Sequence, residues 1–374
     1  MIYLDNAATS FPKPPMVARA MAGTLTRIGG NPGRSGHRYS LCGGRVITAC
    51  RELIAREMGM KTPERVIFTS GCTEAVNLAL RGTLCEGDEV LCSHAEHNAV
   101  MRPLKELERM GSIRVRVLEP DARGLIRSEA IHAALSPRTA LCVINHASNV
   151  TGVVQPMEEI ASALRAYGVP LLVDAAQTAG VLDLSRIGAD MIACAGHKGL
   201  LGPHGTGLLL LGEGMLPRPL VCGGTGSESE SMFQPEELPD RYESGTLNLP
   251  GIAGLMVGAR FAFQHRQEIE QYEHYLASLL RDRLTELRGV RVLGDAGAPK
   301  IGVVSFTVEG RDCGTLTDEL SRKGFALRAG LHCAPSIHSH LGTLTSGACR
   351  ASVGIYNTEE DVCQFIAALR ELIA

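Results

Sequence analysis

The sequence lacks the features that mark several classes of protein. Its formal net charge is only −3, from 37 lysines and arginines against 40 aspartates and glutamates. Neither sign is in enough excess to indicate nucleic acid or an anionic membrane as a partner. The longest apolar runs are far shorter than the roughly 20 residues that cross a membrane. The first residues do not form the basic and then apolar pattern of a secretory signal peptide. We therefore expect a cytoplasmic protein.

Metal-binding and disulfide patterns are also missing. The chain has 12 cysteines but no C-x-x-C pair, and its 12 histidines form no H-E-x-x-H or comparable ligand set. Cys92, Cys142 and Cys194 stand in apolar runs, which is typical of small buried hydrophobic residues. In a reducing compartment such cysteines stay free thiols. The sequence therefore predicts neither a disulfide framework nor a metal site.

The chain does contain short apolar runs that alternate with helical patterns. With 374 residues, 45% of them hydrophobic and 21% charged, it has room for two domains of ordinary globular composition. The alternation over residues 65–211 predicts a mostly parallel sheet with helices on both faces. A helical stretch at 251–288 then leads to a smaller α+β unit. The predicted strands are 65–69, 89–93, 114–118, 141–144, 171–175, 191–194, 206–211, 290–293, 303–308, 325–328 and 349–356; the principal helices are 16–28, 41–58, 99–110, 157–167, 315–323 and 359–373.

Two neighbouring strands end in residues that suit one cofactor. Asp174 follows one apolar run, and Lys198 follows the next after Gly196 and His197. Ligands of open α/β sheets bind at the carboxyl ends of the strands. Pyridoxal phosphate needs a lysine amine for its aldehyde and a carboxylate for its ring nitrogen. Taken alone, the lysine is more typical of a solvated loop and the aspartate of a helix cap, so the combination carries the prediction.

Other polar turns adjoin the same sheet edge. Cys72 and Thr73 open a helix after a strand, which is either a phosphate site or a plain helix cap with a capping acid. His97 stands where another strand becomes a helix, either beside a cofactor or as a structural histidine. Asn149 supplies an amide donor in a third such loop. The long stretch 222–248, which ends in Ser244-Gly245-Thr246, is typical of a functional or interface loop.

These segments together resemble a known family over nearly the whole chain. The sequence is similar to the cysteine desulfurases of the NifS/SufS type, which are pyridoxal-phosphate enzymes of the class V aminotransferase group with the fold-type I architecture. The segments that carry the resemblance occur in family order: YLDNAAT, SGCTEAVN, AEHNAV, SNVTGVVQP, VDAAQTAG, GHKGLLGPHGTG, ESGT, RAGLHCAP and CRASVGIYN. The last two are closer to the SufS branch.

The resemblance implies a fold and a set of roles. The fold would be a mostly parallel, seven-stranded large α/β domain at 16–255, with a small α+β domain formed by 1–15 and 256–374. Lys198 would bind the cofactor aldehyde covalently. The expected cofactor contacts are Asp174, Gln177, His97, Asn149, Cys72, Thr73 and His197, with Thr246 reaching the phosphate in the neighbouring subunit of a homodimer. The expected substrate contacts are Arg350, Asn149, Asn6, Ala7 and Arg34.

The implied reaction converts L-cysteine to L-alanine and transfers the sulfur to Cys333 as a persulfide, for onward transfer to an acceptor protein. Lys198 and His97 would move protons. Selenocysteine lyase, cysteine sulfinate desulfinase, a class V aminotransferase or epimerase, and a catalytically idle scaffold are the alternatives. One position departs from the family: Ala195 replaces a serine or threonine that would bind the phosphate. A hydrogen bond to a charged group contributes about 1.5–3 kcal/mol, so cofactor affinity would be lower.

Overall fold

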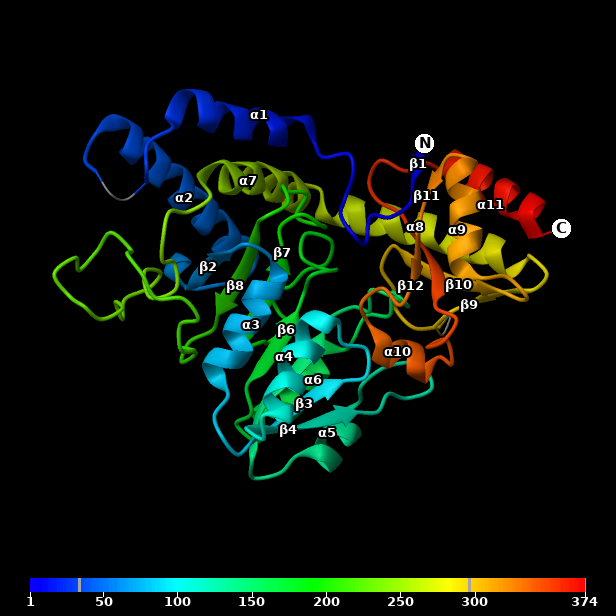
Figure 1. Cartoon of the computed structure of the whole chain (residues 1–374), viewed down its shortest axis with the longest axis horizontal. Helices are drawn as coiled ribbons and strands as arrows, with labels where there is room; N and C mark the ends of the chain where they lie inside the picture. The colour runs from blue at the N-terminus through cyan, green and yellow to red at the C-terminus, as the bar shows by residue number, and fades with distance from the viewer. Residues whose placement is uncertain (33–34, 295–296, 374) are drawn as a thin grey trace.

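The computed structural model describes residues 1–32, 35–294 and 297–373. A large α/β layer structure and a smaller α+β unit lie side by side, and both chain termini lie on the smaller unit (Figure 1). The predicted fold class is confirmed, because the main sheet has seven strands and is mostly parallel.

The main sheet has the strand order β2-β8-β7-β6-β5-β3-β4. Only β8 runs antiparallel to its two neighbours. The strands are β2 (Val66–Thr69), β3 (Asp88–Ser93), β4 (Ile113–Leu118), β5 (Thr139–Asn145), β6 (Leu171–Asp174), β7 (Met191–Ala195) and β8 (Gly207–Leu211). All seven strands predicted between 65 and 211 are therefore confirmed, with ends that differ by at most two residues.

Both faces of this sheet are buried, which explains why its strands are continuous apolar runs. Leu171 and Val173 belong to one hydrophobic cluster, whereas Leu172 between them belongs to the cluster on the other face. Cys92, Cys142 and Cys194 are buried free thiols in these strands, as predicted. One cluster includes α3 (Cys72–Thr83) and α4 (Asn98–Arg109); the other includes α2 (Arg38–Glu57), α5 (Ser128–Ala134), α6 (Met157–Arg165) and α7 (Leu249–Gln264).

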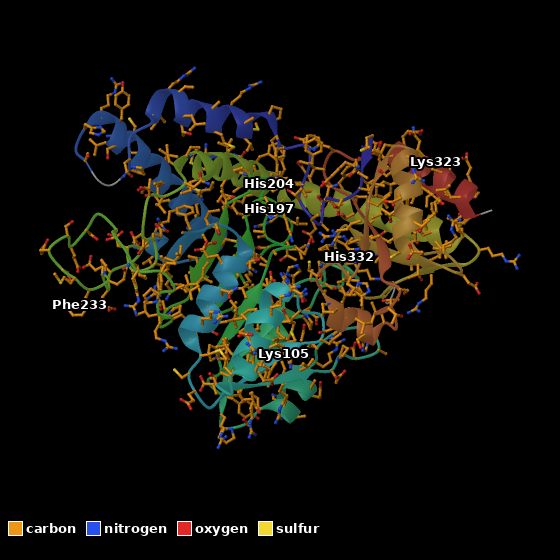
Figure 2. The ribbon with its side chains drawn as sticks, viewed as in Figure 1. Lys105, His197, His204, Phe233, Lys323 and His332 are labelled. Atoms are coloured by element: carbon orange, nitrogen blue, oxygen red, sulfur yellow. The ribbon has the colours of Figure 1, made fainter. Side chains whose placement is uncertain are left out.

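Two long helices join the large and small units. The predicted helical stretch 251–288 is divided at His265 into α7 and α8 (Arg266–Thr285). Helix α1 (Pro15–Gly23), with a π-helical turn at Thr24–Ile28, packs on α7. A long loop precedes α7 and projects away from the body of the molecule, with Phe233 near its tip (Figure 2).

The small unit is built on an antiparallel sheet with the order β12-β13-β10-β9. The N-terminal strand β1 pairs in parallel with β11 in a separate two-stranded sheet, and Leu4 lies in the hydrophobic core of the small unit. The elements are β1 (Ile2–Tyr3), β9 (Val290–Val292), β10 (Val303–Val308), α9 (Cys313–Arg322), β11 (Phe325–Ala326), β12 (Arg328–Gly330), α10 (Pro335–His340), β13 (Ala348–Ser352) and α11 (Glu359–Ile373).

Two predicted strands of this unit were wrong in extent. The strand expected over 325–328 is two short strands, because Phe325–Ala326 pairs with β1 and Arg328–Gly330 pairs with β13. The strand expected over 349–356 ends at Ser352. Beyond it the backbone of Gly354 packs on Asn6, and a Cβ at residue 354 would stand 2.7 Å from the Asn6 side chain.

We propose the division into a large domain of 16–255 and a small domain of 1–15 plus 256–374. The separate core that joins Leu4 to residues 276–369 supports it. The boundary falls inside α7, whose Ala259 packs in the large-domain core. No helix in the described part of the chain has the length and apolar character to span a membrane.

Candidate active site

A cavity of about 290 Å³ opens at the carboxyl ends of the parallel strands, on the side of the small unit. Strands β5, β6 and β7 each end in a residue that lines it: Asn145, Asp174 and Ala195. Most of the predicted site residues meet here: Ala7, Cys72, Thr73, His97, Asn149, Asp174, Gln177, His197, Lys198 and Arg350. Of the others, Asn6, Thr246 and Cys333 lie outside the lining, and Arg34 lies outside the described residues.

Asp174 is buried and presents one free oxygen. Its Oδ1 accepts hydrogen bonds from the Ala176 N–H at 2.9 Å and from the Cys72 thiol at 3.4 Å. Within the described residues, nothing hydrogen-bonds to Oδ2. Burial and the adjacent Asp174 carboxylate raise the pKa of the Cys72 thiol well above its ordinary value, so this thiol is protonated and donates. The carboxylate is thus held on one side and open on the other.

Lys198 follows β7 through a short turn and lines the cavity. Burial lowers its pKa, and the nearby Asp174 carboxylate only partly offsets that effect. No hydrogen bond ties its Nζ in the portion of the chain that the structure describes. An amine with a lowered pKa is more often neutral at physiological pH, which a nucleophile or a general base requires.

The turn between β2 and α3 offers free backbone donors to an anion. Gly71 caps α3 without a side-chain hydrogen bond. The capping acid of the alternative interpretation is also present, because Glu74 accepts the Ser70 N–H at 2.6 Å. The Glu74 carboxylate does not bind the N–H groups of Cys72 and Thr73, and no other described residue accepts a hydrogen bond from them. These two donors at a helix N-terminus favour a phosphate.

His197 stands on the other side of this turn and stacks on His204, with ring centroids 5.1 Å apart (Figure 2). Its Nδ1 is buried with no hydrogen-bond partner among the described residues. Burial, followed by the charge of Lys198, lowers its pKa to about 4. A neutral imidazole with an unsatisfied nitrogen at a cavity wall is suited to a polar ligand. Ala195 nearby supplies no hydroxyl, as the sequence indicated.

His97 has both a structural position and a position at the cavity, the two alternatives that the sequence left open. It caps α4 by accepting the Ala99 N–H at 3.0 Å through Nδ1, which is a structural role. Its ring also lines the cavity. Burial lowers its pKa, opposed by Asp174. Because Nδ1 is used by the helix, the nitrogen available to the cavity is Nε2.

The wall from the small unit carries two arginines that face each other across β12 and β13. Arg350 is only 1% exposed; its Nη2 bonds to the Asp5 carboxylate at 2.8 Å and its Nη1 to the Asn149 carbonyl at 3.1 Å. Its Nε has no hydrogen-bond partner in the described chain. The predicted substrate arginine is therefore already paired on one side by the N-terminal arm.

Arg328 is the cavity residue that sequence reasoning missed. It lines the cavity and is exposed, and no described residue forms an ion pair with it. Its Nη2 lies 3.9 Å from the Cys333 sulfur. Its position at the start of the RAGLHC segment was the available signal, because an arginine five residues before a candidate nucleophile can lie beside it on a tight loop.

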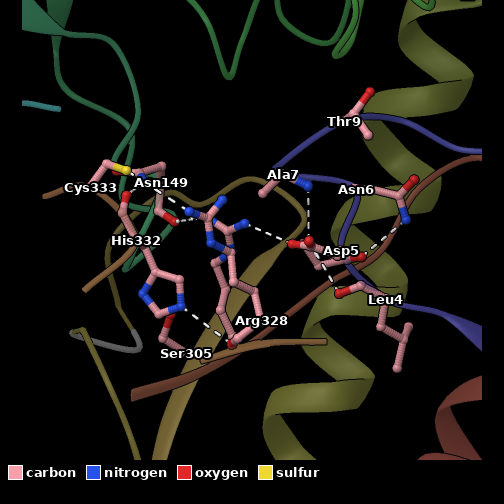
Figure 3. A network of polar contacts seen from close by, with 12 residues as sticks. Leu4, Asp5, Asn6, Ala7, Thr9, Asn149, Ser305, Arg328, His332 and Cys333 are labelled. Atoms are coloured by element: carbon pink, nitrogen blue, oxygen red, sulfur yellow. Dashed lines mark hydrogen bonds and ion pairs between the residues drawn. The ribbon is translucent and has the colours of Figure 1, made fainter. Parts of the chain in front are cut away.

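Cys333 lies in a loop with unusual backbone geometry beside Arg328 (Figure 3). His332 and Cys333 have φ angles of 50° and 58°, a region that non-glycine residues rarely occupy. Two hydrogen bonds from the large unit hold the loop: Asn149 Nδ2 to the His332 carbonyl and the Asn98 N–H to the Cys333 carbonyl, each 2.7 Å. Unlike the strand cysteines, Cys333 is partly exposed.

The remaining predicted residues lie around this cavity. Gln177 donates through Nε2 to the Ala7 carbonyl at 3.0 Å, and the Oδ1 of Asn149 is buried without a described partner. Asn6 is used structurally, since its amide bonds to the Ser352 carbonyl and to Asn357. Thr246 is exposed and lines a second cavity of about 350 Å³, which shares Ser70 and Gly205 with the first.

Comparison with known proteins gives a consistent result. The family model described as aminotransferase class-V matches residues 2–365. The chain is 33% identical to a probable cysteine desulfurase of Halalkalibacterium halodurans, covering 97% of this chain and 90% of the relative. It is 34% identical to a probable cysteine desulfurase of Aeropyrum pernix, covering 100% and 94%.

Solved structures agree with these relatives. The apo cysteine desulfurase of Thermococcus onnurineus superimposes with a TM-score of 0.93 at 31% identity, covering 100% of this chain and 94% of that one. The cysteine desulfurase CsdA of Escherichia coli gives 0.88 at 28% identity, covering 100% and 95%.

Proposed function

The chain belongs to the class-V aminotransferase family, and from this premise we propose that it is a pyridoxal-phosphate-dependent cysteine desulfurase. Within that family, the observation that carries the proposal is the partly exposed Cys333 thiol beside the Arg328 guanidinium at the rim of the Lys198 cavity. Transamination needs no such thiol. The full-length similarity to proteins named as cysteine desulfurases supports the same conclusion.

The residues of the cavity fit the cofactor. The free Oδ2 of Asp174 would bond to the ring nitrogen, and Lys198 would bind the aldehyde. The free N–H groups of Cys72 and Thr73 would hold the phosphate together with His197, and Thr246 of a second subunit would reach it in a homodimer. His97, Gln177 and Asn149 would contact the ring and its oxygen. When bound, the cofactor supplies an electron sink for the Cα carbanion of the substrate.

The protein's own groups would divide the remaining work. Arg350 would bind the substrate carboxylate through its unused Nε side, with Arg328 as a second cation, and Asn6 and Ala7 would close the pocket behind it. Lys198, as a free amine, would remove the Cα proton, assisted by His97. Arg34 stays a prediction of the sequence alone.

Cys333 would then take the sulfur. Its thiolate attacks the sulfur of L-cysteine, so that a new S–S bond forms while the substrate Cβ–S bond breaks. The electron pair of that bond stays with the carbon skeleton, which takes up a proton and leaves as L-alanine. Cys333 retains a persulfide, and a thiol or an acceptor protein removes its outer sulfur. We infer a cytoplasmic location for this transfer, where thiols stay reduced.

The test is L-cysteine turnover by the wild type and by Cys333→Ala, with alanine and sulfide measured together under reducing conditions. Equal amounts of both from the wild type, lost in the variant while the cofactor absorbance band persists, are expected. Full turnover by Cys333→Ala would contradict the role of the thiol. Turnover by that variant of selenocysteine or cysteine sulfinate, whose leaving groups need the thiol less, would favour a lyase or desulfinase instead.

A further inference from the structure

Three buried side chains form a continuous polar chain behind the Cys333 loop. His332, His338 and Thr343 are 3%, 0% and 3% exposed. The Nε2 of His332 contacts the Arg328 carbonyl at 3.3 Å (Figure 3), and its Nδ1 contacts Nε2 of His338 at 3.4 Å. The Nδ1 of His338 contacts the Thr343 hydroxyl at 2.8 Å. The chain thus begins before the Cys333 loop and ends after helix α10.

The protons of this chain can be arranged in one way. A carbonyl only accepts, so the Arg328 contact requires a hydrogen on Nε2 of His332. Burial lowers the pKa of His332 to about 3 and also lowers that of His338, so each ring is neutral and carries one hydrogen. Nδ1 of His332 is then an acceptor, and His338 donates to it through Nε2. Nδ1 of His338 in turn accepts the Thr343 hydroxyl hydrogen at 2.8 Å, a shorter contact than the 3.4 Å from the same hydroxyl to the His338 carbonyl.

This arrangement fixes a backbone that is strained. The left-handed φ angles of His332 and Cys333 persist only where surrounding contacts hold them. Asn149 and Asn98 hold the two carbonyls from the large unit. The histidine chain holds the His332 ring from inside the small unit. With the ring and both carbonyls fixed, the Cys333 sulfur has little freedom to move away from Arg328.

We propose that His338 is a positioning residue for Cys333 and acts through His332. The inference rests on the proposed function, in which Cys333 takes the sulfur. His338 itself is absent from the lining of the Lys198 cavity, whereas His332 belongs to it. An effect of His338 on the reaction would therefore pass through the loop, without contact with substrate or cofactor.

Two substitutions at one position separate the hydrogen bonds from the packing. His338→Phe keeps a planar ring of similar size but removes both hydrogen bonds. His338→Gln keeps one donor for His332 and one acceptor for Thr343. His340→Phe is the matched control, because His340 lies on the same short helix and is exposed, with its ring against His94.

The readouts are the kcat and KM for L-cysteine, the cofactor absorbance band, and the rate at which iodoacetamide alkylates Cys333 without substrate. Peptide mass spectrometry distinguishes alkylation of Cys333 from alkylation of the other 11 cysteines. We expect His338→Phe to lower kcat by about 10- to 100-fold, since a displacement of about 1 Å can cost that much. KM and the absorbance band should stay unchanged. The alkylation rate of Cys333 should change several-fold, because the sulfur leaves its fixed position 3.9 Å from the Arg328 guanidinium.

Rescue decides the mechanism. His338→Gln should recover most of the kcat and alkylation rate, and His340→Phe should match the wild type. Wild-type rates in His338→Phe would overturn the proposal, as would a His338→Gln variant no faster than His338→Phe. If His338→Phe does not fold, Thr343→Val replaces it, because this variant removes the hydroxyl that donates to His338. Its kcat and alkylation rate are then compared with those of the wild type and of His340→Phe. Cys333→Ala runs in parallel, and its continued turnover would reject the proposed function while the alkylation result still reports on His338.

Discussion

The two walls of the cavity are held in place by different means. On the large side, Asp174 and the turn to Lys198 continue from adjacent parallel strands whose register fixes them to each other. On the small side, Cys333 stands on a left-handed loop, and Arg350 depends on a carboxylate from the far end of the chain, Asp5. The residues proposed to bind the cofactor thus inherit their geometry from the main sheet. On the other wall, the Cys333 loop and the Arg350 guanidinium are each held by individual hydrogen bonds, although the backbone of Arg350 lies in β13. Single substitutions on the two walls should therefore have different consequences.

Lys198→Ala should have the largest effect, because it removes a reacting group from the rigid wall. We expect turnover to fall by at least about 10³-fold, within the range for loss of a general base combined with loss of the nucleophile. The cofactor absorbance band of the covalent adduct should disappear, while the melting temperature falls little because the strand stays intact. Retention of the band would contradict the assignment of Lys198.

Arg350→Gln and Arg328→Gln compare two cations on the other wall. Arg350→Gln leaves the partly exposed Asp5 carboxylate without its buried partner, which should cost up to about 3 kcal/mol, the lower end for a buried pair, so it should lower stability as well as activity. Arg328→Gln should leave stability unchanged and raise KM for L-cysteine by about 10- to 100-fold, as expected for loss of about 1.5–3 kcal/mol. Urea unfolding and steady-state kinetics on both variants test the contrast; equal loss of stability would contradict it.

Glu96→Gln tests how a buried carboxyl group that bonds to the end of β5 affects stability at different pH values. Glu96 accepts hydrogen bonds from Ser93 and from the Asn145 N–H, and burial raises its pKa from 4.5 to about 8. A raised carboxyl pKa gives stability that is fully present below 4.5 and is lost as the pH rises towards 8. Glutamine mimics the neutral carboxyl at every pH. Melting temperatures should therefore favour Glu96→Gln over the wild type more at pH 8 than at pH 5; an offset independent of pH would refute this.

Ala195→Ser should have the smallest effect and the opposite sign. It restores a hydroxyl at the end of β7, where the phosphate would bind, in a position that the rigid sheet already fixes. We expect cofactor affinity to rise by up to about 10-fold, which is the lower end of a charged hydrogen bond. Titration of the cofactor-free protein with pyridoxal phosphate measures this directly. Unchanged affinity would mean that Ala195 lies out of reach of the phosphate.

The difference between the two walls of the cavity also explains which site residues could be predicted from the sequence. Asp174 and Lys198 were predictable because each ends an apolar run, and parallel strands bring such ends together. The pairing of Asp5 with Arg350 was not predictable, because it joins residues 345 positions apart without any local pattern. Arg328 was missed for a related reason. The strand expected over 325–328 changes sheets after Ala326, and only that change brings Arg328 opposite Arg350.

The N-terminal arm has a consequence for the order of events during synthesis. Residues 2–5 leave the ribosome more than 300 residues before β11 and β13, the strands with which β1 and Asp5 pair. The large domain can therefore fold while the arm is still without its partners, since domains generally fold as units during translation. Closing this long loop is slow, because contacts distant in sequence form last. The substrate side of the site should accordingly mature only after residues 325–352 have left the ribosome, and a nascent chain truncated before them should bind cofactor before it can accept sulfur.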